Sequence, residues 1–502
     1  MKSTYRIIAT MLLTIFVTTS CQDFLDQNPV SEGTDQTTWK TEADANASVA
    51  ACYSLIRSAF NASITYYAYG DLTSGEFNSV QGGDGAYSDV MNYNWGIGIP
   101  AANIWDPRLK LRLYTNFYTA IMQSNRCLYY IDKMPLSVFT GDGDTEKQAT
   151  KNRYLGEAYF TRAFNYFYIS RVWGDVPLVT SYNDSIATTQ FARTAQSEVL
   201  DLAISDVKQA IIFLDKKDDA SADKVVRADK GSANALLAHI YAWRGEYDKC
   251  NDACDAVINS GSYSYIDSTN YTDIYKGQSV EGIFEITQSS QTESMSATQG
   301  ITSVTLVPPH INNGASQPFW QLDGGLIDYL YSDQTDIRYT SCFEKITNGG
   351  GEVYECIKYA NIQNINNSNA FQIALNNIPV FRYAGIKLLK AEALASKAGP
   401  DYTGALSLVN EVRKVRGAKP FSSLDTYDLL YAISDEQGRE LFLEGHRRFD
   451  LIRFERVIGE QQISYVSPEE FTAGKYYWPV DPILFSTNYK LTQTPYWVGK
   501  MK

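Results

Sequence analysis

The sequence predicts a mostly α-helical protein, in which paired helices form a scaffold and long loop-rich insertions, with minor β structure, interrupt it. Three observations support this prediction. Several segments carry apolar residues at i, i+3, i+4 and i+7, the spacing of one helix face. Two long stretches, near 60–110 and 285–380, lose that spacing and are rich in aromatic and small polar residues. The chain has 502 residues and 44% hydrophobic content, enough for a large core and too much for a disordered protein.

The first residues of the chain predict an export signal. Lys2 and Arg6 are followed by an apolar run from Ile7 to Val17, 11 residues long. A helix that spans a bilayer needs about 20 residues, so we interpret residues 1–20 as a signal peptide. Small residues precede Cys21, as in bacterial lipoproteins, and we predict lipidation of Cys21 as the membrane anchor. The alternative is an ordinary secretory signal that is cleaved near an incidental cysteine.

Four helices are predicted between residues 42 and 214, from the spacing of their apolar residues. Residues 114–134 carry an apolar stripe that includes Phe117, Ile121 and Leu128, and residues 195–214 carry one that includes Val199 and Val207. Such stripes are typical of helices that bury one face. The predicted helices of this part of the chain are 42–59, 114–134, 148–172 and 195–214.

The clearest periodic pattern lies between residues 233 and 261. Leu236, Ala238 and Tyr241 share one helix face, Gly245 interrupts the pattern, and Cys250 and Cys254 then lie one turn apart on a second helix. The spacing of small and aromatic residues fits a tetratricopeptide repeat. We expect both cysteines to be core residues.

Two further helical segments follow near the C-terminus. Residues 383–416 form a second copy of the helix pair, with the break at Gly399-Pro400, and residues 434–456 are predicted as one helix. A single pair cannot bury its own apolar face, and three or more pairs must stack. The expected architecture is an α superhelical scaffold.

Composition excludes several classes of function. The chain has 44 Lys+Arg against 57 Asp+Glu, a net charge of −13, which argues against a nucleic-acid partner. It has three histidines, and the spacing of its cysteines fits no zinc motif. We therefore expect no cofactor and no metal in the ligand site, and the sequence leaves open whether a structural metal is bound. Cys342 and Cys356 could oxidise in an exported protein, but buried free thiols are the favoured interpretation.

The two insertions carry the candidate binding residues. Between Ser58 and Pro107 there is no Lys or Arg, but there are many Tyr and Trp residues among glycines. Aromatic rings can stack on the apolar face of a sugar while amides bind its hydroxyl groups, and the lack of cations favours a neutral glycan. The predicted ligand-binding residues are Tyr67, Tyr93, Asn94, Trp95, Phe319 and Trp320. We expect Trp95, which lies among glycines, and Trp320, which lies in a polar loop, to face outward. Trp105 is expected to pack beneath the helix that follows it.

No catalytic motif was found: the sequence has no His-Glu-x-x-His, no Gly-x-Ser-x-Gly, no phosphate loop and no dinucleotide fingerprint. Glu440 and Glu444 could form a glycosidase pair, but Arg447 and Arg448 lie three and four residues away from Glu444. We interpret the two carboxylates as members of a structural ion-pair network and predict that the protein is not an enzyme.

Several motifs in this order resemble the SusD/RagB family of outer-membrane lipoproteins from Bacteroidetes. They are Cys21–Pro29, Arg162–Phe167 with Trp173–Leu178, Tyr383-Ala384 with Lys390–Ala393, Asn410–Arg413 with Arg416-Gly417, Glu440–Leu451, and Trp478–Val480 with Asn488 and Gln493–Pro495. Together they extend over nearly the whole of residues 21–502, which suggests one SusD-like domain with insertions near 60–110 and 285–380.

The resemblance implies about four tetratricopeptide-like helix pairs and a location at the outer membrane, facing the exterior. It also implies capture of a glycan beside a SusC-like TonB-dependent transporter, with the binding site between the two aromatic insertions. Two alternatives stay open: capture of peptides by the same architecture, as in the RagB branch of the family, and a surface glycosidase.

Overall fold

The structure is a computed structural model that describes residues 38–81, 86–182, 189–288, 293–297, 299–348, 351–365 and 368–501. The predicted signal peptide, residues 1–20, and the predicted lipidation site, Cys21, lie outside the described residues. Among the described helices, none combines the length and the apolar character that a membrane span requires.

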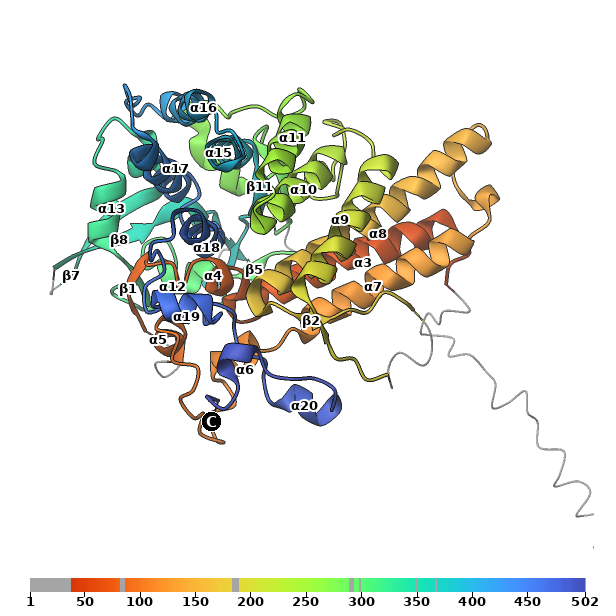
Figure 1. Cartoon of the computed structure of the whole chain (residues 1–502), viewed down its shortest axis with the longest axis horizontal. Coiled ribbons are helices and arrows are strands. Elements are labelled where there is room, and N and C mark those ends of the chain that lie inside the picture. Colours follow the sequence, from red (N-terminus) through yellow and green to blue (C-terminus); the bar gives the residue numbers. More distant parts are fainter. Residues whose placement is uncertain are drawn as a thin grey trace, which may run out of the picture.

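In the described chain, four helix pairs form the scaffold, as the family resemblance implies (Figure 1). Each pair packs against the next, through α7 and α8, α9 and α10, and α11 and α15. The pairs are α3 (Glu42–Asn61) with α7 (Thr115–Lys133), α8 (Asp144–Trp173) with α9 (Gln196–Phe213), α10 (Lys230–Arg244) with α11 (Tyr247–Ile258), and α15 (Tyr383–Ser396) with α16 (Tyr402–Val415).

The α10–α11 pair shows how local sequence sets the helix ends. Asp229 and Ser232 form a capping box at the start of α10, which satisfies two of its free N–H groups. Gly245 ends α10 in the left-handed conformation, with φ of 73°, where a side chain would be strained. Cys250 and Cys254 are fully buried on α11, as predicted. The six cysteines of the described chain are all buried free thiols.

The prediction of a single helix over residues 434–456 is wrong. The chain forms α17 (Thr426–Glu440) and α18 (Arg447–Ile458), separated by a turn in which Leu443 and Gly445 have φ of 55° and 77°. At Gly445 a Cβ atom would lie 2.3 Å from the ring of Tyr66, so only glycine fits. The Gly445 N–H donates to the buried carboxylate of Asp71 instead of continuing a helix.

Outside the helix pairs, the described chain forms short strands and helices, many of them in the two insertions. The described strands form small antiparallel sheets: β1 (Phe77–Val80) with β6 (Trp320–Leu322), β2 (Val176–Pro177) with β3 (Arg193–Thr194), β4 (Gly282–Ile286) with β11 (Ile378–Arg382), β7 (Phe343–Asn348) with β8 (Gly351–Cys356), and β5 (Met295–Ser296), β10 (Ser368–Ala374) and β9 (Ile362–Ile365) in one sheet. The short helices are α4 (Thr65–Gly70), α5 (Ala86–Met91), α6 (Pro107–Leu111), α12 (Ile301–Thr305), α13 (Gly324–Leu330), α14 (Ile337–Cys342), α19 (Pro468–Thr472) and α20 (Ile483–Thr487).

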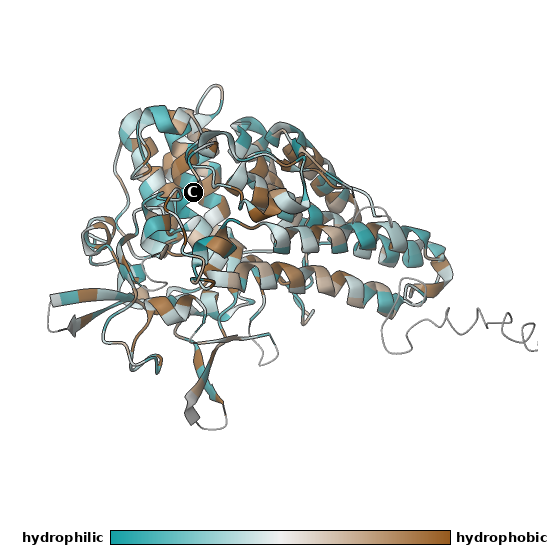
Figure 2. Cartoon of the chain, turned by 90° about the horizontal axis from the view of Figure 1, so that it is seen from below, coloured by the Kyte–Doolittle hydropathy of each residue, from teal (hydrophilic) through white to brown (hydrophobic). Residues whose placement is uncertain are grey.

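The core joins scaffold and insertions. One cluster of buried residues includes Phe164 and Trp173 of α8, Phe449 of α18, and Trp95 and Trp320 of the insertions. Figure 2 shows hydrophobic and hydrophilic residues alternating along the helices, and two β-ribbons that project from the helical body. The insertions are therefore fastened to the helices by aromatic packing.

Candidate ligand-binding site

The two tryptophans predicted to bind ligand are buried. Trp320 is fully buried, and its ring packs edge-on against Phe77 and Tyr87 at centroid distances of 5.3 and 5.1 Å. It lies on β6 opposite Val80 of β1, so it joins the two insertions directly. The expectation that this ring faces outward is wrong, because the strand pairing places it between the two segments.

Trp95 is also fully buried. Its ring packs on Trp478 at a centroid distance of 4.7 Å. The neighbouring Gly96 does not expose it: a Cβ atom at Gly96 would lie 2.4 Å from the Lys500 carbonyl oxygen, so this glycine permits a close approach of the C-terminal segment. The expectation of an exposed Trp95 is wrong for this reason.

The other predicted residues divide into buried and exposed ones. Tyr93 is buried, and its hydroxyl donates to the Thr73 hydroxyl and accepts from the Arg448 guanidinium. Asn94 is exposed, and Phe319 is 40% exposed. Tyr67 is 5% exposed and lines a pocket.

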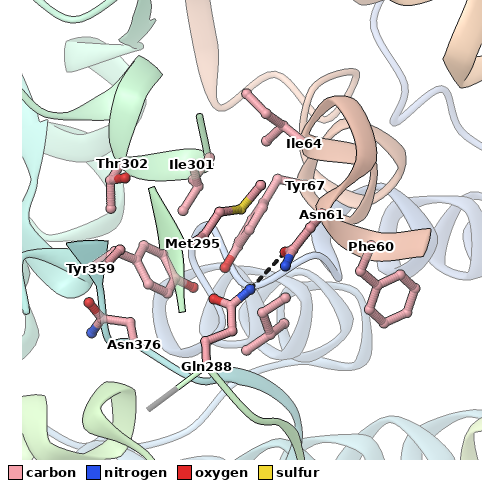
Figure 3. A pocket seen from close by; sticks show the side chains of 13 residues that line it. Phe60, Asn61, Ile64, Tyr67, Gln288, Met295, Ile301, Thr302, Tyr359 and Asn376 are labelled. Carbon is pink, nitrogen blue, oxygen red and sulfur yellow. Dashed lines mark hydrogen bonds between the residues drawn. The ribbon is translucent and has the colours of Figure 1, made fainter. Parts of the chain in front are cut away.

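That pocket lies between the two insertions, where the resemblance suggests a site (Figure 3). It contains about 390 Å³ of empty space, including solvent at its mouth, and is lined by Tyr67, Met295 and Tyr359 among others. Its amide groups are already engaged, since Gln288 Nε2 donates to Asn61 Oδ1 over 2.7 Å. A sugar that used these two amides would have to break this bond.

Trp105 is exposed to solvent, contrary to the prediction that it packs beneath the helix that follows it. It is 85% exposed, and it is the one exposed tryptophan among the described residues, which include all eight in the chain. Ile97 and Ile104 in the same loop are 47% and 63% exposed. This exposed apolar group is a candidate interaction site.

A buried ion pair holds the Trp105 loop in place. Arg108 Nη2 lies 2.7 Å from Asp106 Oδ2, and its Nη1 lies 2.8 Å from Asp89 Oδ2. The same Nη1 donates to the carbonyl oxygen of Ile97, so both ends of the loop meet at one guanidinium. Asp106 also caps the start of α6. The loop therefore presents the Trp105 ring from a fixed base, and the Asp106-Pro107-Arg108 sequence was the signal that could have indicated this.

Glu440 and Glu444, the two carboxylates considered as a glycosidase pair, are fully buried in the core. Glu440 is fully buried and contacts three guanidinium groups: Arg338 at 2.8 Å, Arg416 at 2.8 Å, and Arg382. Burial alone would raise the pKa of Glu440, but Arg416, Arg382 and Arg338 hold it well below its ordinary value. This carboxylate is ionised and has no contact with solvent.

Glu444 belongs to the same network. Its oxygens lie 2.7 Å from Arg382 Nε and 2.8 Å from Lys358 Nζ. The structural interpretation is confirmed, but the expected partners are wrong: Arg447 donates to Ser434, and Arg448 donates to the carbonyl oxygens of Tyr69 and Tyr476. The helix break after Glu440 removes the i+3 and i+4 geometry on which that expectation depended.

Comparison with known proteins identifies relatives along most of the chain. Residues 23–242 match a family described as starch-binding and associating with the outer membrane, and residues 312–497 match the SusD family. A SusD-like protein from Formosa agariphila is 26% identical over 89% of this chain and 91% of that protein. The starch-binding protein SusD of Bacteroides thetaiotaomicron is 35% identical over 103 residues, 20% of this chain and 15% of that protein.

Solved structures agree with this assignment. The crystal structure of a SusD homologue from Bacteroides thetaiotaomicron superposes with a TM-score of 0.77 and 26% identity, over 92% of this chain and 99% of the other. The helix pairs, the insertions and the ordered motifs thus have one common explanation. The chain belongs to the SusD/RagB family.

Proposed function

We propose that this protein is a non-catalytic, cell-surface protein of the outer membrane that captures a neutral oligo- or polysaccharide. The family description and the name of the Bacteroides thetaiotaomicron relative, both starch-binding, support a glycan ligand. The single observation that carries the proposal for this chain is the exposed, firmly held Trp105.

The chemistry of the Trp105 loop suits a sugar. A sugar that stacks on one face of the indole would cover roughly 50 Å² of apolar surface, worth about 1.3 kcal/mol at 25 cal/mol per Å². Such an energy corresponds to about tenfold in affinity. Asn94 is exposed on the same segment and could bind hydroxyl groups.

The charges near this segment favour an uncharged ligand. No Lys or Arg occurs between residues 58 and 107. Asp71, Glu76 and Asp106 are buried, and Asp89 is paired with Arg108. The described surface of the segment is therefore close to neutral, and it offers no cation to a sulfated or uronate-rich glycan.

We further propose that the protein is anchored through a lipid on Cys21 and delivers its glycan to a SusC-like TonB-dependent transporter. The sequence of residues 1–21 supports the anchor, and family membership supports the transporter partner. The burial of Glu440 and Glu444 supports a non-catalytic role, because neither carboxylate can reach a glycosidic bond.

A binding experiment with matched variants tests the ligand class. Affinity gels with starch, xylan, galactomannan and laminarin, and parallel titrations with a casein digest, would be run with the unmodified chain, Trp105→Ala and Ile104→Ala. We expect retention by at least one neutral polysaccharide, a loss of about tenfold in affinity in Trp105→Ala, and little change in Ile104→Ala, which removes apolar area but no ring.

Two outcomes would contradict the proposal. Binding of casein peptides without binding of any polysaccharide would favour the peptide-capturing alternative. Equal losses in Ile104→Ala and Trp105→Ala would show that the loop docks through general apolar contact and not through stacking of a sugar on the indole.

A further inference from the structure

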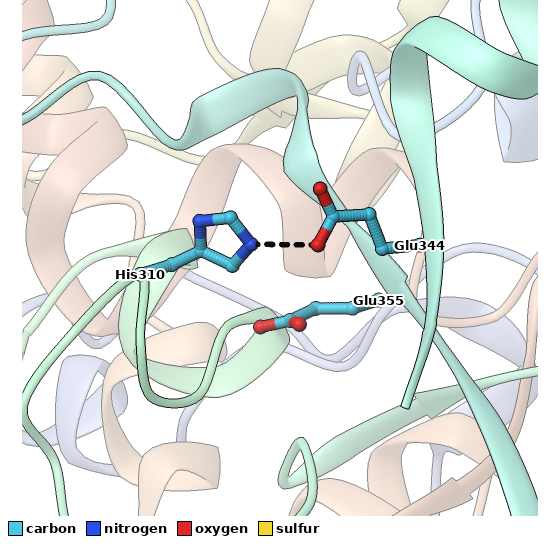
Figure 4. Close-up of side chains that lie close together, drawn as sticks. All are labelled: His310, Glu344 and Glu355. Carbon is cyan, nitrogen blue, oxygen red and sulfur yellow. Dashed lines mark hydrogen bonds and ion pairs between the residues drawn. The ribbon is translucent and has the colours of Figure 1, made fainter. Parts of the chain in front are cut away.

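Three side chains converge at the base of the β7–β8 hairpin, outside the sites described above (Figure 4). They are His310, which follows α12 in the chain, Glu344 of β7 and Glu355 of β8. One ligand atom from each lies within 4.8 Å of the other two. His310 Nε2 and Glu344 Oε2 are 3.0 Å apart.

The two carboxylates lie opposite each other, where two negative charges repel. Glu344 and Glu355 are direct partners across the antiparallel hairpin, so their side chains project from the same face. Like charges directly opposite one another destabilise a sheet. Among the described residues, no Lys or Arg forms an ion pair with either of them, and His310 is the one basic partner.

Glu355 supplies an independent observation. It is fully buried, and one carboxylate oxygen, Oε1, accepts a hydrogen bond from the Val307 backbone N–H. The other oxygen, Oε2, is buried and has no hydrogen-bond partner in the described chain. A buried carboxylate oxygen without a partner is costly unless a cation or proton satisfies it.

We propose that His310, Glu344 and Glu355 bind a divalent transition-metal cation of the zinc class. One imidazole nitrogen and two carboxylate oxygens are ligands that Zn²⁺ takes, with water completing a tetrahedral site. Ca²⁺ and Mg²⁺ prefer six or more oxygen ligands, so this set of three favours zinc over them. The side chains of His310 and Glu344 are 21% and 49% exposed, which leaves a path for the ion from solvent.

The cation would fasten the segment after α12 to the hairpin. Leu306 and Ile311 of that segment belong to a small apolar cluster beside Ile357 and Ile362. The described cluster has three buried members, so apolar packing at this point is limited. A metal that links His310 to β7 and β8 would stabilise the same contact. The ligands are separated by 34 and 11 residues, which is why no spacing motif indicates them in the sequence.

Metal titration of the tag-free chain tests this site. After treatment with a chelating resin, the protein would be titrated with ZnCl₂ in a calorimeter, with CaCl₂ and MgCl₂ in separate runs, and the bound metal would be measured by mass spectrometry. We expect one zinc ion per chain, a rise in Tm on zinc binding, and no comparable binding of calcium or magnesium.

Variants assign the ligands. His310→Gln and Glu344→Gln change partly exposed side chains, and each should weaken zinc binding at least tenfold and abolish the Tm shift. Glu352→Gln is the control. Glu352 lies on β8, the strand of Glu355, but its side chain is 65% exposed and pairs with Lys345. Glu355→Gln should also lose zinc, but its burial makes the other two variants the decisive ones.

The proposal is overturned if no zinc binds, if His310→Gln and Glu344→Gln bind it as tightly as the unmodified chain, or if calcium binds in its place. None of these outcomes bears on glycan capture, which the affinity gels test separately.

Discussion

At the scale of the residue, sequence context did not reveal which tryptophans are exposed. Trp95 sits among glycines, a pattern that suggested exposure, yet Gly96 serves a backbone contact with Lys500 about 400 residues away. Trp105 was expected to be covered, yet the Arg108 ion pairs hold its neighbour Asp106 inward and leave the indole outside. The two errors have different causes. The contact that covers Trp95 comes from a segment distant in the sequence, whereas the Asp106–Arg108 pair beside Trp105 is local and is readable from the sequence.

Glu440→Gln tests the structural role of the buried network. The change leaves three guanidinium groups without their shared carboxylate, so we expect the free energy of unfolding to fall by about 3–5 kcal/mol. Urea denaturation followed by circular dichroism measures this. Glu469→Gln, an exposed change on α19, serves as control and should stay within about 0.5 kcal/mol. A loss below about 1 kcal/mol in Glu440→Gln would contradict the assigned role.

At the scale of the element, the helices were predictable because their apolar spacing is local. The segments expected at 42–59, 114–134 and 195–214 agree with α3, α7 and α9 to within two residues at each end. The break between α17 and α18 was not predictable, because it depends on Gly445 contacting Tyr66 and Asp71 of another segment. The sequence predicted minor β structure in the insertions but not the individual strands. β1 and β4 pair with partners distant in the sequence, whereas β7 with β8 and β9 with β10 form local hairpins.

Trp320→Ala separates a packing role from a binding role. The ring fills the space between Phe77 and Tyr87 where β1 pairs with β6, and its removal should cost about 3–5 kcal/mol of stability. Glycan affinity of the folded fraction should not change. Phe319→Ala, at the adjacent and partly exposed position, is the control and should leave stability within about 0.5 kcal/mol. Unchanged stability with lost glycan binding in Trp320→Ala would restore Trp320 as a ligand contact.

A pH dependence should arise where α10 meets the start of α18. His239 is buried, stacks on Phe381 at 4.8 Å and lies 5.9 Å from the His446 ring. Burial lowers the pKa of His239 well below its ordinary value, and the neighbouring His446, Arg453 and Arg171 lower it further. Burial also lowers the pKa of His446, although the charge of Asp450 raises that pKa in part. Both rings are neutral in the folded protein.

The sign of the effect follows from proton uptake. Below about pH 6.5 the unfolded chain binds protons at these histidines and the folded chain does not, so stability is lost as pH falls. Each histidine contributes up to about 1.4 kcal/mol per pH unit in that range. His239→Phe should flatten the loss between pH 6.5 and 5, measured by urea denaturation at each pH. Parallel curves for the variant and the unmodified chain would rule out this contribution.

At the scale of the whole molecule, the four described helix pairs form the frame. The insertions are joined to it by aromatic packing and by the ion pairs of Arg338 with Glu440 and Lys358 with Glu444. The sequence predicted the frame from periodicity and the family from ordered motifs. It did not predict which side chains of the insertions are exposed, because their exposure depends on how the two insertions pair with one another. The central claim is that this frame presents Trp105, and not Trp95 or Trp320, to a neutral glycan.

Tryptophan oxidation by N-bromosuccinimide, mapped by mass spectrometry with and without a saturating polysaccharide that the protein retains, tests this claim most directly. We predict that Trp105 is oxidised first among the eight tryptophans, that Trp95 and Trp320 resist, and that the polysaccharide protects Trp105 several-fold. Oxidation of Trp105 at an unchanged rate in the polysaccharide complex, or selective protection of Trp95 or Trp320, would contradict it.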